Sequence, residues 1–321
     1  MKVVIYMWKF SHWLEAYSIF CYFKGIDAVK VVFMESDRVN KKSVTALFEE
    51  FKKNISFEYE IAKDKEELGK KIREEFDTLV RGDVFAAPIF PFRNMGAYMP
   101  IARKRGIVTV HLNDGFPDCF GYYGYRLGYL TRGGVNVIKL LKQSFLLPFF
   151  YFFWRTHMPD LSFYNMAPNV KIPVVKRTVQ AFVPKLEEEK KRYLQGLTKG
   201  EKRPLLIAGF DYELDKMVKY LKIDKYIATS KMREIIIDGK RIALDYYVCA
   251  EDVLLSGCSD RIIGYSSTAM TWAYRIGGID IVCYESPKMN EIYGYYGKFA
   301  RSTMKKCGLT LLPACKDMIK N

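Results

Sequence analysis

The sequence predicts an α/β protein of two domains, each built on a mostly parallel sheet with helices on both faces. Three observations support this prediction. Strand-like apolar runs alternate with helix-like amphipathic runs in both halves of the chain. The chain has 321 residues, more than one small core accommodates. Its 50% hydrophobic and 27% charged residues are ordinary for a folded globular protein.

Five apolar runs rich in Val, Ile, Phe and Tyr organise the first half of the chain. They predict strands at residues 3–8, 28–34, 55–61, 83–89 and 107–112. Between these runs the apolar residues recur every three or four positions, which is the period of a helix that packs on one face. Helices are therefore expected at residues 13–23, 41–53, 65–80 and 93–105.

The alternation breaks near residue 160. Four prolines, at positions 159, 168, 173 and 184, precede or interrupt this stretch, and the charged run KLEEEKKRYLQGLTKGEKR follows. We interpret it as an interdomain connection that carries one surface helix. The expected division is a first domain at 1–160, a linker at 161–203, a second domain at 204–300 and a helical tail at 301–321.

The second half repeats the α/β pattern. Strands are expected at residues 205–210, 225–229, 261–265 and 280–285, and helices at 212–221 and 250–257. The run EIIIDGKRIALDYY at 234–247 predicts a hairpin that turns on Asp238-Gly239. A further helix is expected to open at Ser266-Ser267-Thr268. Two such domains joined by a linker predict a deep cleft between them.

The composition narrows the class of partner. A formal net charge of +15 favours an anionic partner, which could be nucleic acid, an anionic membrane or a phosphate-bearing substrate. Seven Cys without a CxxC pair indicate reduced cysteines in a reducing compartment. Only three His occur, far apart in sequence, so a His-rich metal site is not expected. The N-terminus reads as a strand rather than a signal peptide, and a cytoplasmic location is expected.

One apolar run points toward a membrane. SFLLPFFYFFW at residues 144–154 follows Lys139 and Lys142 and precedes Arg155. It is too short to span a bilayer, which takes about 20 residues. The run is either an interfacial helix on an anionic leaflet or a buried helix at an interdomain contact. Peripheral attachment to the inner face of the membrane therefore stays open.

Polar residues follow several predicted strands, and ligands of open parallel sheets bind beyond the carboxyl ends of strands. Asn113-Asp114-Gly115 follows the strand at 107–112. Asp114 is either a general base held at the end of a rigid strand or part of a simple turn. The segment after it is rich in aromatic residues and glycine, and it contains Asp118, Tyr122, Tyr123 and Arg126.

The second half offers candidates for holding a nucleotide. Ser266, Ser267 and Thr268 stand at a predicted helix start, where they either bind a phosphate or simply cap the helix. Lys231 and Arg233 either neutralise a phosphate or form an exposed charged pair. Gly209 either lets a nucleotide base approach the backbone closely or is a turn glycine. Glu251 either binds the hydroxyls of a ribose or stabilises the start of its helix.

Other chemistries lack their motifs. The sequence contains no GxxxxGK[ST] loop, no GxGxxG after a first strand, no GxSxG and no HExxH. No DxD stands beside a predicted strand, which argues against a metal-dependent sugar-nucleotide transferase and leaves room for a metal-independent one.

The order and spacing of the candidate residues resemble bacterial sialyltransferases and polysialyltransferases, which have two Rossmann-like domains facing a central cleft (the GT-B arrangement). That family carries an acidic D/E-D/E-G motif, then a His-Pro motif, a ribose-binding Glu and a Ser-Ser/Thr motif. Asn113-Asp114-Gly115 stands where the acidic motif belongs. Glu251 matches the ribose-binding position, and Ser266 with Ser267 matches the last motif. Gly209 matches a glycine near the cytosine.

Two positions depart from the family pattern. Lys231-Met232-Arg233-Glu234 stands where the family has a run like His-Pro-Arg-Glu, so Lys231 replaces the histidine. A lysine stabilises a departing phosphate as a point charge but is a poor proton donor near neutrality, since its usual pKa is about 10.4. The first acidic residue of the acidic motif is also replaced, by Asn113.

The resemblance implies an inverting, metal-independent glycosyltransferase that moves sialic acid from CMP-sialic acid to a capsular or lipooligosaccharide acceptor. Asp114 is then the general base, and no cofactor is required. The aromatic segment after Asp114 lies where the acceptor is expected, and its rings either stack on sugars or pack in the core. The candidate acceptor-side residues are Asn113, Asp118, Tyr122, Tyr123 and Arg126. One alternative keeps the fold but uses CMP-Kdo or a nucleotide diphosphate sugar. Another class of function is a non-catalytic basic protein that binds nucleic acid or an anionic membrane. Nucleic acid is not expected, because no RRM or zinc-finger pattern is found. The acceptor, the linkage and the oligomeric state do not follow from the sequence.

Overall fold

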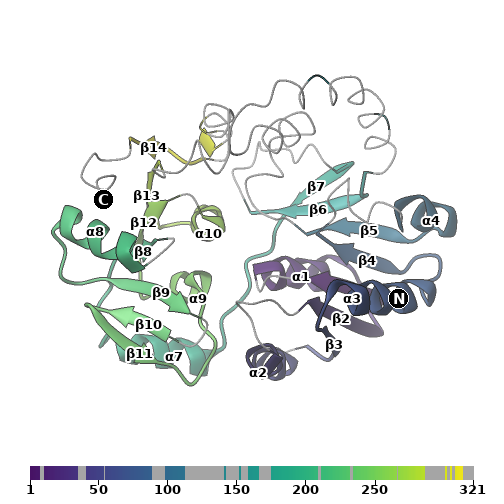
Figure 1. The fold of residues 1–321 in the computed structure, drawn as a ribbon, viewed down its shortest axis with the longest axis horizontal. Helices are drawn as coiled ribbons and strands as arrows, with labels where there is room; N and C mark the ends of the chain where they lie inside the picture. The colour runs from purple at the N-terminus through teal and green to yellow at the C-terminus, as the bar shows by residue number, and fades with distance from the viewer. Residues whose placement is uncertain are drawn as a thin grey trace. The chain divides into compact units, whose positions relative to one another are not determined.

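The protein is an α/β structure with two mostly parallel sheets of seven strands each (Figure 1). The computed structural model describes residues 1–7, 11–34, 41–53, 55–88, 98–112, 141, 152, 158–165, 175–208, 211–231, 234–265, 267–285, 301, 304–305 and 308–313. The chain divides into two compact units. The first unit holds the first sheet and comprises Met1–Tyr122, Val137–Tyr164 and Lys171–Pro184. The second unit comprises Tyr123–Asn136, Asn165–Val170 and Lys185–Asn321. Each unit is compatible with a Rossmann-like domain.

The first sheet is entirely parallel, in the order β3-β2-β1-β4-β5-β6-β7. Its strands are β1 (Lys2–Met7), β2 (Ala28–Met34), β3 (Glu58–Ala62), β4 (Val84–Ala87), β5 (Val108–His111), β6 (Leu161–Tyr164) and β7 (Arg177–Gln180). The chain order reverses between β1 and β4. This reversal is the topological switch point at which ligands of such sheets usually bind.

Helices cover both faces of this sheet, as the alternation predicted. They are α1 (Ser11–Tyr22), α2 (Lys41–Lys52), α3 (Lys65–Asp77) and α4 (Tyr98–Arg105). Val32 of β2 belongs to a buried cluster with Phe76 of α3 and Met99 of α4. The next residue, Phe33, faces the opposite side, where its ring meets that of Phe48 in α2. Both faces are therefore apolar, which explains the nearly continuous hydrophobic strands.

The structure corrects part of the predicted linker at 161–203. β6 and β7 lie within it and extend the first sheet, with His111 of β5 paired with Ser162 of β6. These strands have only four residues each and contain polar positions, so their apolar signal is weak. The expected helix is present as α7 (Glu188–Leu197), but its Lys190 and Leu194 are buried rather than on the surface.

The second sheet has the order β11-β10-β9-β8-β12-β13-β14. Its strands are β8 (Leu205–Ile207), β9 (Ile227–Lys231), β10 (Glu234–Ile237), β11 (Lys240–Ala243), β12 (Arg261–Tyr265), β13 (Asp280–Tyr284) and β14 (Leu311–Leu312). Five of these strands pair in parallel, in the order β9, β8, β12, β13 and β14. β10 runs antiparallel to both β9 and β11. The helices are α8 (Asp211–Leu221), α9 (Ala250–Ser256) and α10 (Thr268–Ile276). β14 places part of the predicted helical tail at 301–321 in this sheet.

The predicted hairpin turn is confirmed. Asp238 and Gly239 both have positive φ, 50° and 79°, as a type I′ turn between β10 and β11 requires. The Asp238 carboxylate also accepts hydrogen bonds from the Tyr226 amide at 2.9 Å and the Arg203 guanidinium at 3.0 Å. Arg203 is buried and donates to the Thr198 carbonyl oxygen as well. The turn is thus tied to the segment that leads into β8.

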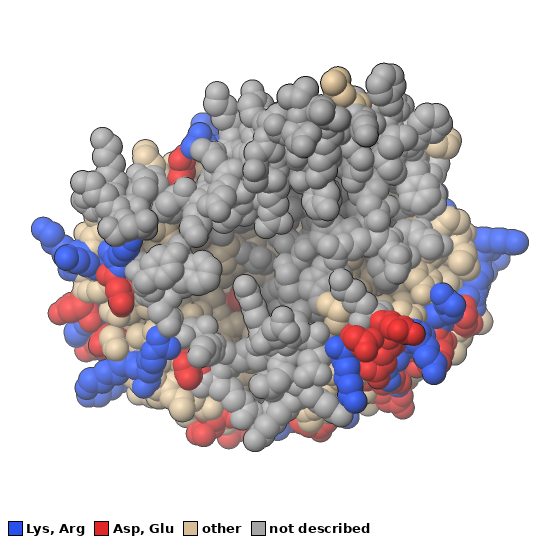
Figure 2. Space-filling view, in the orientation of Figure 1, with Lys and Arg blue, Asp and Glu red and all other residues tan. Residues whose placement is uncertain are grey.

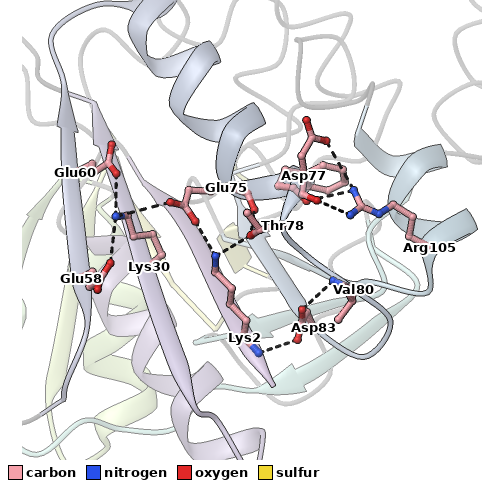
Figure 3. Close-up of polar contacts among 11 residues, drawn as sticks. Lys2, Lys30, Glu58, Glu60, Glu75, Asp77, Thr78, Val80, Asp83 and Arg105 are labelled. Atoms are coloured by element: carbon pink, nitrogen blue, oxygen red, sulfur yellow. Dashed lines mark hydrogen bonds and ion pairs between the residues drawn. The ribbon is translucent and has the colours of Figure 1, made fainter.

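A network of ion pairs joins three strands of the first sheet to α3 (Figure 3). Lys30 Nζ of β2 lies 2.8 Å from Glu60 and 3.3 Å from Glu58, both on β3, and 3.8 Å from Glu75 of α3. Lys2 of β1 approaches Glu75 to 2.9 Å. Burial alone lowers the pKa of Lys30, but the hydrogen bonds and charges of these carboxylates outweigh it and raise that pKa.

Glu60 is the most strongly paired carboxylate of the network. Hydrogen bonds from Lys30 and Lys71 lower the pKa of Glu60, and the second of these bonds is 2.7 Å long. A carboxyl group whose pKa is lowered on folding stabilises the folded state at pH values above its ordinary pKa, which is ~4.3. This contribution is lost as the pH falls through the lowered pKa of the folded state.

We therefore expect Glu60→Gln to lower the unfolding free energy by about 1 kcal/mol at pH 7, because two lysines lose a partner. The difference from the parent should shrink at pH 3, because the pH is then below the ordinary pKa of a glutamate and closer to the lowered pKa of folded Glu60. Urea unfolding at both pH values measures this. Glu58→Gln is the matched control, since Glu58 pairs with the same Lys30 but is 83% exposed; its effect should stay within about 0.5 kcal/mol. Equal effects of both variants would contradict the network.

Candidate functional site

The carboxyl edge of the second sheet is the candidate site. β8 is the first strand of this unit, β9 lies on one side of it and β12 on the other. The switch point of the second sheet therefore lies between β8 and β12, where a ligand crevice is expected. Three of the candidate positions, Lys231, Glu251 and Ser267, belong to elements that end or begin at this edge.

Gly264 brings β8 and β12 close together at the switch point. It pairs with Ile207 in register and has a φ of 155°, which side chains rarely adopt. A Cβ on Gly264 would lie 2.1 Å from the Ile207 carbonyl oxygen, well inside contact distance. Only glycine fits here. The sequence analysis did not single out this residue, because a glycine inside a strand-like run has several possible roles.

Ser267 is the N-cap of α10. Its backbone is extended, its Oγ accepts a hydrogen bond from the Ala269 amide at 3.2 Å, and its carbonyl accepts from the Met270 amide. The capping alternative of the sequence analysis is therefore correct for this hydroxyl. The helix N-terminus is still a favourable place for an anion, because the helix dipole is positive there. Thr268 is the first residue of α10, and Ser266 lies outside the described residues.

Glu251 lies in the first turn of α9 and is only 7% exposed. Burial raises the pKa of Glu251, and the neighbouring Asp252 charge adds to this; hydrogen bonds from its own backbone N–H and from the Cys249 thiol act in the opposite direction. Burial also raises the pKa of Cys249 well above its usual value. A buried carboxyl group with a shifted pKa is a candidate ligand-binding group.

Chain direction places Glu251 at the same edge as Ser267. α9 precedes β12, and a helix that leads into a parallel strand runs antiparallel to it. The end of α9 lies near the start of β8, since the Arg203 amide donates to the Cys258 carbonyl oxygen at 2.9 Å. The first turn of α9 is therefore toward the carboxyl edge. α9 and α10 pack against each other (Figure 1).

Lys231 is the last residue of β9, where it pairs with Glu234 of β10. The sequence analysis expected the strand to end at residue 229 and Lys231 to follow it. The structure continues the strand by two residues and leaves only 232–233 to connect β9 with β10. Because β9 is the parallel neighbour of β8, the backbone of Lys231 also lies at the carboxyl edge.

All the acceptor-side candidates lie outside the described residues: Asn113, Asp118, Tyr122, Tyr123 and Arg126. The same holds for Asp114, Gly209 and Arg233. The strand that leads to Asp114 is confirmed, because β5 ends at His111 and Leu112 follows it. His111 is buried, and its carbonyl oxygen accepts a hydrogen bond from Ser162 at 2.9 Å.

The sequence did not predict the buried ion pair between two further residues of this region, Lys190 and Asp252. Lys190 of α7 lies 3.2 Å from Asp252 of α9, and its side chain is 3% exposed. Lys190 belongs to a charged run that is typical of a solvated helix, so sequence alone favoured an exposed position. Asp252 stands next to Glu251, and nothing in the pattern separates the roles of the two carboxylates.

The described surface carries both signs of charge. Figure 2 shows Lys and Arg side chains interspersed with Asp and Glu on the face it displays. Across the described residues, no group of three or more His, Cys, Asp and Glu is arranged to hold a metal ion. Within the same ranges, no helix has the length and apolar character to cross a membrane. A comparison with protein-family models finds no match to the sequence, and neither does a comparison with curated proteins.

We expect Gly264→Ala to destabilise the second unit by about 3 kcal/mol or more, because the methyl group would collide with a backbone oxygen that cannot move freely. Gly196→Ala is the control: Gly196 lies in α7 with open space around its Cβ position, and alanine there should stabilise by about 0.5–1 kcal/mol. Urea unfolding compares the two. A neutral Gly264→Ala variant would contradict the close approach of β8 and β12.

Proposed function

We propose that this protein is an inverting, metal-independent glycosyltransferase that moves sialic acid from CMP-sialic acid to a glycan acceptor of the capsule or lipooligosaccharide type. The proposal includes a GT-B arrangement of two Rossmann-like domains and a cytoplasmic location, and it leaves peripheral attachment to the inner face of the membrane open. No cofactor is part of it.

One observation carries the proposal. At the carboxyl edge of a mostly parallel sheet, the N-cap Ser267 of α10 and the buried Glu251 of α9 come from two adjacent helices. A helix N-terminus suits a phosphate, and a carboxylate suits the two hydroxyls of a ribose. These two groups occur in the order that the resemblance to sialyltransferases implies, which supports a nucleoside monophosphate as the ligand of this unit.

The reaction is a direct displacement. Asp114 takes the proton of an acceptor hydroxyl, whose oxygen attacks the anomeric carbon of the sialic acid. The bond between that carbon and the CMP phosphate oxygen breaks, its electron pair leaves with CMP, and the configuration inverts. The donor's own carboxylate stabilises the positive charge that develops on the sugar, so the step needs no metal.

Lys231 and the N-terminal turn of α10 stabilise the phosphate as it leaves. Lysine at position 231 acts as a fixed positive charge rather than as a proton donor, since the usual pKa of a lysine is far above neutrality. The remaining candidates complete the donor site: Gly209 next to the base, and Arg233, Ser266 and Thr268 next to the phosphate. On the acceptor side, Asn113, Asp118, Tyr122, Tyr123 and Arg126 contact the glycan.

Two alternative functions stay open. A site of the same construction accepts CMP-Kdo or a nucleotide diphosphate sugar if the contacts beyond the ribose differ. The net charge of +15 favours the second alternative, a non-catalytic protein on an anionic membrane or nucleic acid. Among the described residues, Figure 2 shows Lys and Arg interspersed with Asp and Glu on the face it displays.

Calorimetric titration with CMP, UDP and GDP at raised salt tests the donor site, and we expect clear preference for CMP.

Ser267→Asp keeps the cap of α10 but places a negative charge where the phosphate binds, so stability should be kept and CMP affinity should fall about tenfold or more. Ser267→Ala is the matched variant, which should lose about 1 kcal/mol of stability as the cap is lost. Normal CMP binding by Ser267→Asp would rule out a phosphate at this helix.

Asp114→Ala should reduce sialic acid transfer at least about 100-fold while CMP binding stays unchanged, because only the base is lost. Asp114→Asn keeps the size of the side chain and should be equally inactive. Transfer is measured with CMP-sialic acid and a panel of glycan acceptors, and CMP binding by calorimetry. Full transfer activity of either variant would show that Asp114 is not the base.

A further inference from the structure

An arginine–glutamate pair lies at the carboxyl end of β13. Glu285 directly follows this strand, and its amide donates to the Leu312 carbonyl oxygen of β14 at 2.9 Å. Arg301 Nε lies 2.5 Å from Glu285 Oε1, and Arg301 Nη2 donates to Glu285 Oε2 at 2.8 Å. One edge of the guanidinium therefore faces both oxygens of the carboxylate, as in a fork-like pair. This contact fixes both the place and the orientation of the Arg301 charge.

The pairing of β12 with β13 places Glu285 next to the strand that leads into α10. Tyr265, the last residue of β12, pairs with Tyr284, the last residue of β13. Neighbouring strands of a sheet lie about 4.8 Å apart. Ser267, two residues beyond Tyr265, is the N-cap of α10, and Glu285 is one residue beyond Tyr284. Ser267 and Glu285 therefore follow neighbouring strands at the same carboxyl edge.

Glu285 also lies on the face of the sheet that carries α10. The ring of Tyr284 contacts that of Tyr220 in α8. Successive side chains of a strand point to opposite faces, so Glu285 is on the face opposite to α8. The crossovers from β8 to β9 and from β12 to β13 run in opposite directions across the sheet, and right-handed connections therefore place α8 and α10 on opposite faces (Figure 1). The Arg301 guanidinium thus shares its edge and its face with the N-terminus of α10.

Arg301 keeps donors for a ligand. A guanidinium carries N–H groups on three nitrogens, and the pair with Glu285 occupies the Nε and Nη2 edge. In the part of the chain that the structure describes, no acceptor contacts Nη1 of Arg301. The Arg301 side chain is 41% exposed, so a ligand can reach it. A guanidinium of fixed orientation with available N–H groups suits the oxygens of a phosphate.

We propose that Arg301 is a phosphate-binding residue of the second unit and that Glu285 is the positioning residue that orients its guanidinium. The N-terminus of α10 at Ser267 and the Arg301 charge both favour an anion at this edge. That the phosphate belongs to CMP rests on the proposed function. The anion site itself rests only on the geometry of β13, α10 and the Arg301–Glu285 pair.

Two variants of the full chain, titrated with CMP by calorimetry, separate binding from structure. Arg301→Met should lower CMP affinity about tenfold or more, because charged hydrogen bonds to the phosphate are lost. Glu285→Gln keeps the guanidinium and an oxygen that accepts from Nη2, so CMP affinity should stay within about threefold of the parent. Both variants lose the same ion pair. Equal losses of CMP affinity would show that the pair only holds the structure, and the proposal would fall.

A third variant covers the case in which Arg301→Met does not fold. Arg301→Lys keeps the positive charge but lacks the planar fork, so it cannot face Glu285 and a phosphate in the same way. Its CMP affinity should fall about threefold or more, by less than a full loss of the charge would cause. Parent-like CMP affinity in Arg301→Lys would contradict the proposed fork contact.

Arg261→Met is the matched control for charge. Arg261 Nε lies 2.7 Å from Asp280 Oδ2, and this pair joins β12 and β13 at their opposite, amino ends. The variant removes one positive charge and one arginine–carboxylate pair, as Arg301→Met does. Its CMP affinity should match the parent's within about twofold at raised salt, where distant charges are screened. A loss as large as that in Arg301→Met would mean that CMP responds to net charge and not to the carboxyl edge, against the proposal.

Three further ligands identify the group that Arg301 contacts. Cytidine lacks the phosphate, so its affinity should be the same in the parent and in Arg301→Met. Inorganic phosphate, followed by ³¹P NMR line width, should bind the parent and not the variant. If Arg301→Met binds CMP normally and loses affinity only for CMP-sialic acid, the guanidinium contacts the sugar carboxylate, and the phosphate assignment is wrong.

The proposed function and this inference fail separately. If the parent binds inorganic phosphate but not CMP, and Arg301→Met loses the phosphate, the donor is wrong and the anion site stands. If CMP binds the parent and Arg301→Met alike, the nucleotide site stands and Arg301 is not part of it. If the parent binds neither ligand, both are wrong.

Discussion

Parallel strand pairing is the constraint on which the rest of this structure depends. A parallel neighbour is reached only through a crossover, so each connecting helix runs opposite to its strands. Strand carboxyl ends and helix starts therefore gather at one edge of each sheet. In the second sheet this edge collects Lys231, Glu251 and Ser267 from three separate connections. The close approach of Gly264 to Ile207 then holds β8 and β12 together at the switch point, next to the start of α10.

Charge is used differently in the two units. In the first, Lys2 and Lys30 bridge strands to α3 near the surface, where water screens each pair and its contribution is small. In the second, Lys190 and Asp252 are buried, and the cost of removing two charges from water offsets most of their attraction. A buried pair of this kind is weak support for stability alone.

Much of the fold was predictable because local patterns and tertiary packing agree. β2 begins and ends at the predicted residues, 28 and 34, since its apolar run is buried on both faces. The Asp238-Gly239 turn was predictable because few other residues adopt positive φ at both positions. β6 and β7 were missed, because four-residue strands with polar positions among prolines have almost no signal of their own. They are strands because β5 and then β6 offer an edge to pair with.

The sequence by itself determined the class of fold, the order of the elements and the residue types that reach the strand ends, because periodicity and turn chemistry are local properties. It left open whether Ser267 caps a helix or binds phosphate, and the geometry of α10 assigns the hydroxyl to the cap. Only the tertiary structure decided that Lys190 is buried and pairs with Asp252, since the partners are 62 residues apart and look like ordinary surface charges. The difference between Glu251 and its neighbour Asp252 is likewise a property of packing, because it depends on which carboxylate the α7 lysine reaches.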